Sequence, residues 1–365
     1  MSLKVDWDLF VVMLLLTVTG LVMIYSSSAV SAYELVGQTQ YFFLRQLIWS
    51  LLGLGTCFVA CYVSFETIRT LSPAFYLGVL ALLGVVLVPA LGREASGAWR
   101  WIDLGVVGIQ PSAPAKLSII LMCAYYLTAV DLKPNLRVKH LVVVLSLTFL
   151  YCFLIALQPD LGTAIQIGLI TLIMLFLAGF PVSHLITIGI LSIPVGAITI
   201  FSSGYRTERV VAYLNPWSDP YDKGYHIIQS FNALAAGGLT GRGIGESVRK
   251  KGYLPEPYTD SIVAVMGEEL GLIGITVLIG LLVYLTYKGF SVSLRATDTF
   301  QQLVGLGISS FIGLQALLNL SVVTGLIPTT GISMPFISYG GSALLVNMTA
   351  VGLLLNISRG RHKNV

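Results

Sequence analysis

The sequence contains very little charge: Asp, Glu, Lys and Arg make up 10% of its 365 residues, whereas hydrophobic residues make up 56%. A soluble domain usually has about a quarter of its residues charged. So few charges cannot cover the water-facing surface of a protein of this size. The composition excludes a soluble globular enzyme, a disordered chain and an ordinary nucleic-acid binder, and it predicts a polytopic membrane protein. The small net charge of +4 indicates no polyanionic partner.

Cysteine is also scarce. The chain has four cysteines, and all of them fall inside apolar segments: Cys57, Cys61, Cys123 and Cys152. Cys57 and Cys61 share a helix face, but no His or carboxylate lies near them to complete a metal site. We therefore expect packing residues, with neither a disulfide framework nor a metal centre.

Long apolar runs dominate the rest of the chain, and a helix of about 20 such residues crosses a bilayer. Ten stretches qualify: 9–28, 46–64, 72–91, 114–130, 141–157, 161–180, 183–202, 262–287, 302–323 and 340–358. The predicted fold is all-α, a single membrane domain over residues 1–365 with ten transmembrane helices. One long extracytoplasmic loop, residues 203–261, lies between the seventh and eighth spans.

An even number of spans places both termini on the same side of the membrane. Cytoplasmic termini put most cations of the tails and short loops inside, which follows the positive-inside rule. The basic loop 203–261 is discounted because a loop near the length limit of that rule crosses regardless of its charge. The predicted location is the plasma membrane, with both termini cytoplasmic.

Ionisable residues at bilayer depth are costly and therefore informative. Lys116 lies about one turn inside its span, and Asp160 directly precedes the span 161–180. Lys116 either extends to the interface or lies inside the bundle, facing an anion or Asp160. Asp160 either caps the following helix or takes part in function. We expect the two side chains to share one outward-facing polar cavity with Asp260.

The loop 203–261 carries most of the remaining charge, including Arg209, Arg242 and Lys250, and a glycine-rich run at 237–245. Closely spaced glycines let backbone amides approach a phosphate, and the interleaved cations favour an anionic ligand such as a diphosphate. No strand precedes the run, so it is not a dinucleotide-binding motif. The alternative is a basic loop that is simply solvated.

Asp260 lies at the border between this loop and the apolar run that follows. Partial desolvation of a carboxylate at such a border suits it to act as a general base.

Glu268 and Glu269 lie two turns further on, inside the eighth span. At least one of them should face the bundle interior and pair with a cation, because burying an unpaired carboxylate costs several kcal/mol. The nearest candidate cations are Arg206, Arg209 and Lys116. Neighbours on a helix point about 100° apart, so we expect one glutamate to matter and the other not.

Several of these segments, in this order, resemble the SEDS family (shape, elongation, division and sporulation). The matching pieces span the chain: Gln110-Pro111-Ser112 with Lys116, 158–163, 215–220, 224–226, 229–230, 237–245, 254–260, 267–271 and 335–342. Ile327–Gly331 and Asn356-Ile357 favour the FtsW branch over RodA. Ala113 stands where the family usually has an acid, and Tyr258 stands where a His is usual.

The resemblance implies a glycosyltransferase that polymerises lipid II, the undecaprenyl-diphosphate-linked disaccharide pentapeptide, on the outer face of the plasma membrane during division or elongation. The family's essential aspartate falls on Asp260, the catalytic residue. Glu268 and Glu269 are structural polar residues. Substrate contacts are assigned to Lys116, Asp160, Arg209, Arg242, Lys250, Ser338 and Ser342.

No cofactor is implied with certainty. A divalent cation (Mg2+ or Mn2+) is compatible with a diphosphate leaving group, although the sequence contains no readable ligand set. The implied partners are a class B penicillin-binding protein and other divisome or elongasome membrane proteins, and nucleic acid is not among them.

Two other functions remain open. A transporter or flippase of the lipid-linked precursor also has intramembrane charges and interrupted spans. It needs polar groups near the midplane and on both sides, whereas here they gather on one face. A non-catalytic scaffold for a penicillin-binding protein predicts no special cost for losing Asp260.

Overall fold

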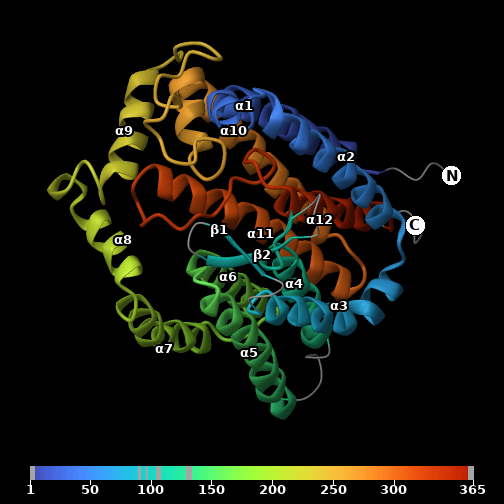
Figure 1. Ribbon diagram of the computed structural model, residues 1–365. Coiled ribbons are helices and arrows are strands. Elements are labelled where there is room, and N and C mark those ends of the chain that lie inside the picture. The colour runs from blue at the N-terminus through green and yellow to red at the C-terminus, as the bar shows by residue number, and fades with distance from the viewer. Residues whose placement is uncertain (1–4, 89–91, 96–97, 104–107, 129–133, 361–365) are drawn as a thin grey trace.

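The computed structural model describes residues 5–88, 92–95, 98–103, 108–128 and 134–360 (Figure 1). Within these residues, each of the ten predicted stretches overlaps a helix. Eight helices are long and apolar enough to cross a membrane: α1 (Trp7–Val36), α2 (Tyr41–Tyr62), α3 (Phe65–Val85), α5 (Pro134–Leu157), α7 (Val182–Phe201), α10 (Ile262–Ser293), α11 (Thr299–Val323) and α12 (Gly341–Gly360). Two more apolar helices, α4 (Ser112–Leu127) and α6 (Leu161–Leu177), are shorter. The prediction of an all-α polytopic membrane protein is confirmed.

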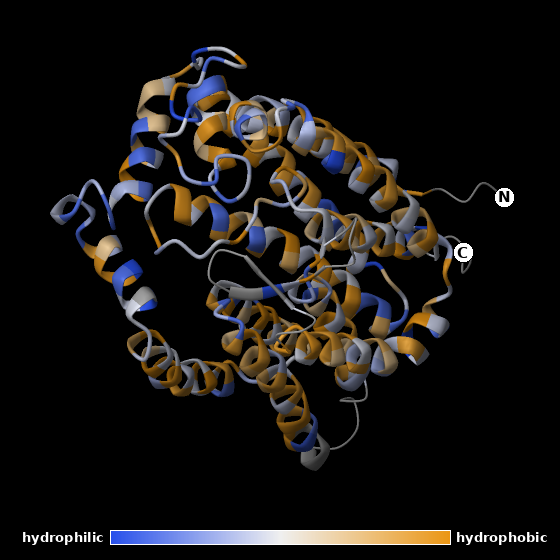
Figure 2. Ribbon diagram, in the orientation of Figure 1, coloured by the Kyte–Doolittle hydropathy of each residue, from blue (hydrophilic) through white to orange (hydrophobic). Residues whose placement is uncertain are grey.

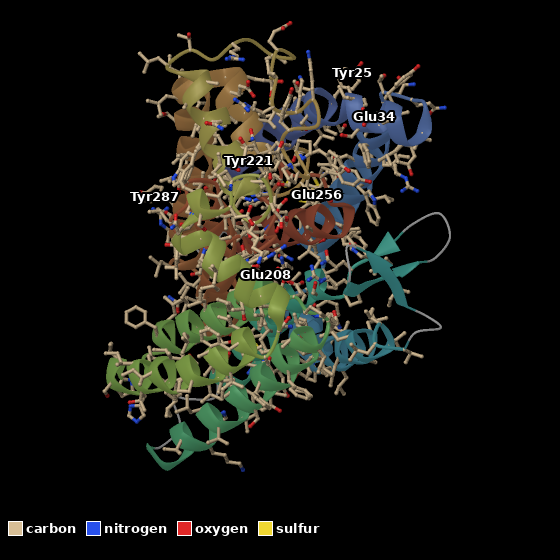
Figure 3. The ribbon with its side chains drawn as sticks, turned by 60° about the vertical axis from the view of Figure 1, so that its left-hand side comes forward. Tyr25, Glu34, Glu208, Tyr221, Glu256 and Tyr287 are labelled. Atoms are coloured by element: carbon tan, nitrogen blue, oxygen red, sulfur yellow. The ribbon has the colours of Figure 1, made fainter. Side chains whose placement is uncertain are left out.

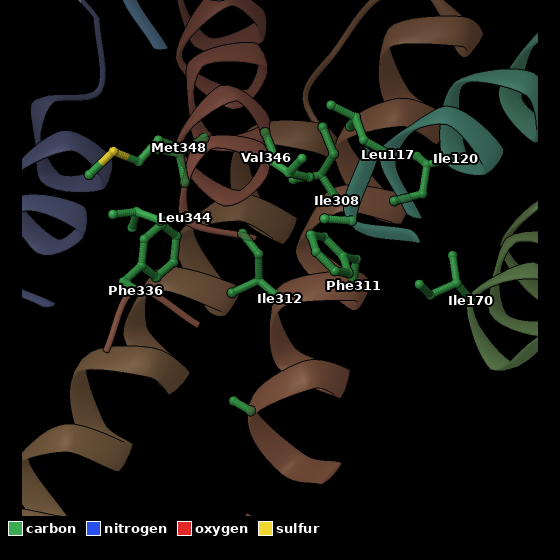
Figure 4. Close-up of a cluster of buried hydrophobic side chains, with 14 of the residues drawn as sticks. Leu117, Ile120, Ile170, Ile308, Phe311, Ile312, Phe336, Leu344, Val346 and Met348 are labelled. Carbon is green, nitrogen blue, oxygen red and sulfur yellow. The ribbon is translucent and has the colours of Figure 1, made fainter. Parts of the chain in front are cut away.

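The hydrophobic core is built around α11 and α12, which are apolar around most of their circumference and are largely buried. Figure 4 shows how α11 presents Ile308, Phe311 and Ile312 to side chains from α4, α6 and α12. Helix α12 packs along α2, and α10 packs against α1, α9 and α11. The site described below is therefore supported by the most buried helices of the molecule.

Helix α7 lies at the periphery, where it packs against α6 and α8. None of its residues, all of which the structure describes, is buried. Figure 2 shows α7 hydrophobic around its surface, whereas α8 carries hydrophilic residues. An apolar helix that its own chain leaves exposed on nearly every side is typical of a membrane span.

Both ends of the described chain lie at one end of the molecule. The backbone N–H of Asp6 donates to the Ser358 hydroxyl at 3.1 Å, which joins the start of α1 to the end of α12. Lys288, near the end of α10, pairs with Asp8 at 2.5 Å. Because Asp260 precedes the other end of α10, it lies at the opposite end of the molecule from the chain ends.

A small three-stranded sheet, which the sequence did not lead us to expect, lies between α3 and α4. Its strands β1 (Gly92–Ala95), β2 (Ala98–Asp103) and β3 (Gly108–Ile109) pair antiparallel in that order. From β2, the Arg100 guanidinium donates to the backbone carbonyls of Gln158, at 3.0 Å, and of Pro159. The sheet is therefore attached to the turn that carries Asp160.

The loop between α7 and α10 is partly helical. It contains α8 (Gly204–Leu214), a 3-10 turn at Pro216–Ser218 and α9 (Tyr225–Gly237). Helix α9 packs against α10, and a non-helical segment of 24 residues, 238–261, returns the chain to the start of α10.

Candidate active site

Asp260 is half-buried at the end of the loop, directly before α10. Its backbone carbonyl accepts a hydrogen bond from Asn319 Nδ2 of α11 at 3.0 Å, and its Oδ1 lies 3.1 Å from the Thr259 hydroxyl, whose single hydrogen it shares with Glu256 Oε2 at 3.3 Å. A core helix thus fixes the backbone of this residue. We call residues 255–261 the Asp260 turn; Figure 3 labels Glu256, which belongs to it, and Glu208 of α8.

An aromatic cluster holds the Asp260 turn from another side. The Tyr258 ring stacks on Phe42 of α2 with the ring centres 4.4 Å apart, and the Tyr339 ring lies edge-on to both. The backbone N–H of Tyr339 also donates to the Tyr258 carbonyl at 2.8 Å. The departure from the family pattern at Tyr258 therefore gives a packing contact.

Other titratable groups surround Asp260. Glu256 is exposed at the surface, but partial desolvation by its neighbours, reinforced by the negative charge of Asp260, raises its pKa, while the Thr259 hydroxyl opposes this shift. Burial lowers the pKa of His226; the charge of Asp260 opposes this effect and Arg209 adds to it. Asp260 is therefore close enough to both Glu256 and His226 to interact with them electrostatically, and Arg209 is close enough to interact with His226.

A second polar centre contains Lys116 and Asp160. Lys116 is 7% exposed, its Nζ lies 5.6 Å from the centre of the Phe311 ring, and it is within electrostatic reach of Asp160. Asp160 accepts from the Thr163 N–H at 3.2 Å as the N-cap of α6 and from the Ser112 hydroxyl at 3.4 Å. Lys116 is thus an interior cation that does not extend to the interface, and Asp160 combines capping with a place beside that cation.

The Asp260 turn and the centre of Lys116 and Asp160 are linked through α11, which contacts both of them. The loop 324–340 also lies beside both. Phe311 and Asn319 lie eight residues apart on α11, which is about 12 Å along the helix. Asn319 also donates to the Ile332 carbonyl at 2.8 Å, and Arg209 donates to the Thr329 carbonyl at 3.1 Å. In the described part of the chain, no hydrogen bond or ion pair joins Lys116 directly to Asp260, so their place in a common cavity stays a prediction.

Near the start of α12, the hydroxyl groups of Ser338 and Ser342 both accept hydrogen bonds from backbone N–H groups. Ser338 Oγ accepts from the Met334 N–H at 2.8 Å and so closes the turn that contains it. Ser342 Oγ accepts from the Gln110 N–H at 3.1 Å, which ties the start of α4 to α12.

Glu268 is fully buried and is satisfied by the loop 238–261. Its carboxylate accepts from the Ser247 hydroxyl at 2.6 Å, from the Val248 N–H at 3.1 Å and from the Arg249 N–H at 3.2 Å. The Arg242 guanidinium pairs with it at 3.3 Å.

Glu269 is also buried but has a different cation. Lys250 Nζ lies 2.6 Å from its Oε1, and the Lys250 side chain is 5% exposed. The Ser26 hydroxyl of α1 donates to this carboxylate at 2.7 Å, and Lys250 donates to the same hydroxyl oxygen at 2.9 Å. The expectation that a glutamate pairs with a cation is confirmed, but Arg206, Arg209 and Lys116 were the wrong partners.

The glycine-rich run 237–245 forms hydrogen bonds with the backbone of α10. This helix is interrupted at Gly271, where φ is 66° and ψ is −168°. The N–H groups of Arg242 and Gly243 donate to the carbonyls of Glu268 and Glu269, each at 3.0 Å. A Cβ at Gly241 would lie 2.2 Å from the Glu269 carbonyl oxygen, so glycine allows this close approach. These two amides bind helix carbonyls, so they are not available to a phosphate.

No metal ligand set can be assigned. Within the described residues, no group of three or more His, Cys, Asp or Glu side chains is placed to hold a metal ion.

Comparison with known proteins gives consistent results over the whole length. A family of cell cycle proteins that groups FtsW, RodA and SpoVE matches residues 6–363. The probable peptidoglycan glycosyltransferase FtsW of Geobacter sulfurreducens is 41% identical over 354 residues, which cover 96% of this chain and 95% of that protein. The stage V sporulation protein E of Bacillus subtilis is 40% identical and covers 97% of each chain.

Solved structures have the same fold. A chain of a peptidoglycan synthase complex, described for its structural coordination of polymerization and crosslinking, matches with a TM-score of 0.82 and 31% identity over 100% of both chains. The crystal structure of the rod shape determining protein RodA of Thermus thermophilus matches with a TM-score of 0.73 and 26% identity over 98% of both chains. On these matches the chain belongs to the SEDS family of FtsW, RodA and SpoVE proteins.

Proposed function

We propose that Asp260 is the general base of this chain, a peptidoglycan glycosyltransferase of the SEDS family that serves cell division, elongation or sporulation. The observation that carries this assignment is the position of Asp260. Asp260 is half-buried just before the N-terminal end of α10, and its backbone is held by Asn319 of a core helix. A base must be held rigidly at a place that substrate can reach.

The proposed reaction needs one proton acceptor and one stabilised leaving group. Asp260 takes the proton of the acceptor sugar's 4-hydroxyl, whose oxygen attacks the anomeric carbon of the donor. The bond from that carbon to the diphosphate breaks, and the polyprenyl diphosphate leaves as an anion. Cations that lie near the leaving oxygens stabilise this developing charge.

Lys116 and Arg209 are the proposed cations, with Asp160, Ser338 and Ser342 as neighbouring polar groups. Lys116 and Asp160 form one centre, and Arg209 reaches the loop that passes between this centre and Asp260. The pairing of Arg242 with Glu268 and of Lys250 with Glu269 favours structural roles for these two cations. If Lys250 bound substrate, it would leave the buried Glu269 carboxylate without its cation. If Arg242 bound substrate, Glu268 would lose its cation and keep its hydrogen bonds to Ser247, Val248 and Arg249.

We also propose ten membrane crossings with cytoplasmic termini. Helices α4 and α6 have 16 and 17 residues, which corresponds to about 24–26 Å against a hydrocarbon core of about 30 Å. Their surroundings support a crossing despite this shortfall, because α4 is almost entirely buried by protein. The resulting even number of crossings agrees with the contact between the ends of α1 and α12.

The proposed partner is a class B penicillin-binding protein, together with other membrane proteins of the division or elongation machinery. The support is the 31% identical chain found within a peptidoglycan synthase complex.

Incubation of the purified protein with lipid II, with and without a partner transpeptidase, tests the activity. We expect ladders of glycan polymer on a gel. Absence of polymer together with movement of lipid II across vesicle membranes would indicate a flippase. Absence of both, in a preparation that still binds its partner, would indicate a scaffold.

A further inference from the structure

The Asp260 turn is closed by a hydrogen bond between its two ends. The Ser261 hydroxyl donates to the Pro255 carbonyl at 3.1 Å, and Ser261 is fully buried. Inside the turn, Glu256 has a φ of +48°, which lies in the left-handed region. A residue other than glycine pays about 1–2 kcal/mol for this conformation, which persists only where the surroundings enforce it. The contacts that enforce this turn therefore decide where Asp260 lies.

His226, the second residue of α9, makes one of these contacts. Its Nε2 lies 2.9 Å from Ser261 Oγ. Ser261 has a single hydroxyl hydrogen, which is directed to the Pro255 carbonyl, and a carbonyl can only accept. With the hydroxyl hydrogen assigned to the Pro255 carbonyl, the imidazole is the donor of the bond between His226 and Ser261, and its proton is placed on Nε2.

We propose that His226 is a positioning residue for Asp260. Its Nε2–H donates to Ser261, Ser261 donates to Pro255, and this chain of hydrogen bonds holds the strained turn in the conformation that presents the carboxylate. The inference rests on the proposed role of Asp260 as general base. His226 acts through Ser261 and needs no contact of its own with substrate.

The support for His226 is itself rigid. Helix α9 packs against α10, and the Arg249 guanidinium donates to Gln229 Oε1 of α9 at 2.7 Å. The charged groups that act on the imidazole are Asp260 and, from α8, Arg209. The imidazole also lies in the first turn of α9, where the helix dipole disfavours a positive charge. The environment therefore suits a neutral imidazole that serves as a hydrogen-bond donor.

Three substitutions of one residue separate this role from general packing. The amide nitrogen of His226→Gln reaches the place of Nε2, whereas that of His226→Asn reaches only the place of Nδ1, and His226→Ala has no donor. We expect kcat for lipid II polymerisation to fall less than about threefold in the Gln variant. In the Asn and Ala variants it should fall about 10- to 100-fold, as for a misplaced catalytic group, with KM changed less than about twofold.

Ser261→Ala should reproduce the loss of kcat seen in His226→Ala, and the double variant should be no worse than either, because both remove the same chain of contacts. Ser261→Ala keeps this test decisive if the imidazole variants fold poorly. Full activity of His226→Asn, or a Gln variant as impaired as Ala, would overturn the inference.

Asp260→Asn, measured in the same assay, distinguishes a failure of the positioning role of His226 from a failure of Asp260 as the general base. If Asp260→Asn is inactive while His226→Asn and Ser261→Ala are fully active, the positioning role fails and the proposed base remains. If Asp260→Asn polymerises normally, the proposed base fails whatever the His226 variants do.

Discussion

Glu268 and Glu269 are adjacent residues with separate sets of partners. Glu268 is bound by loop amides, Ser247 and Arg242, whereas Glu269 is bound by Lys250 and Ser26. Both carboxylates are buried and each is paired with a cation, so the expectation that at least one of them faces the protein interior is confirmed. That only one of the two matters for function stays a prediction. The interruption of α10 at Gly271 lets the loop 238–261 wrap around this part of the helix and reach both side chains.

The buried pair of Lys250 and Glu269 gives the first prediction. Lys250→Met leaves an uncompensated buried carboxylate and should destabilise the protein by about 3–5 kcal/mol. Lys251→Met, at the exposed neighbouring position, should change stability by less than about 0.5 kcal/mol. Thermal unfolding in detergent measures both variants. A double variant in which Glu269 also becomes Met should recover much of the loss, and equal melting of Lys250→Met and wild type would contradict the pairing.

His226 gives a prediction about pH. Its folded pKa is lowered from the ordinary value of 6.5, chiefly by burial. The unfolded chain therefore binds more protons just below pH 6.5, and the folded protein loses stability as the pH falls through that window. The melting temperature of wild type should drop further between pH 7.5 and pH 5.5 than that of His226→Gln.

Glu256 does not disturb this comparison. It has a raised pKa, which favours the folded state on acidification, but it is present in both proteins and its effect cancels. Identical pH dependence of wild type and His226→Gln would show that the imidazole is not buried in its neutral form.

At the scale of elements, the interruption of α10 depends on close backbone approach. Gly241 has a φ of +78° and lies against the Glu269 carbonyl, while Gly245 has a φ of +91° and open space around its Cα. Gly241→Ala should therefore melt at a clearly lower temperature than Gly245→Ala. Both variants carry the same conformational cost of about 1–2 kcal/mol, but only Gly241→Ala adds a backbone clash. Equal melting of the two would mean that the close approach is unimportant.

The helices could be predicted because the signal for a membrane-spanning helix, a long apolar run, can be read from the local composition of the sequence. In the structure α7 ends at Phe201 and α10 begins at Ile262, close to the ends predicted for the two apolar runs that flank residues 203–261, while the extracytoplasmic location of this loop stays a prediction. The small sheet was missed because apolar run length carries no information on strand pairing; the aromatic residues at Trp99 and Trp101 were the available signal. For the glycine run, the sequence favours an anionic ligand and leaves a solvated loop as the alternative. Its observed partner, the interruption of α10, depends on tertiary contacts that the sequence pattern does not reveal.

At the scale of the whole molecule, the proposed orientation can be tested by labelling. Cys57, Cys61 and Cys123 are buried and Cys152 is half-buried, so the wild-type chain should react little with a membrane-impermeant maleimide. In intact cells stripped of any outer membrane, Glu246→Cys should be labelled and Thr297→Cys should not. Both positions are exposed on the protein surface. The opposite pattern would invert the orientation and place Asp260 in the cytoplasm.

The central claim is that Asp260 is the general base, and polymerisation of lipid II by Asp260→Asn tests it most directly. The matched control is Asp222→Asn, which alters an exposed carboxylate of the same loop. Wild type and Asp222→Asn should give ladders of similar yield, whereas Asp260→Asn should lose about 100-fold or more of the rate while eluting and melting as a folded protein. Polymer at a near-normal rate from Asp260→Asn would contradict the account.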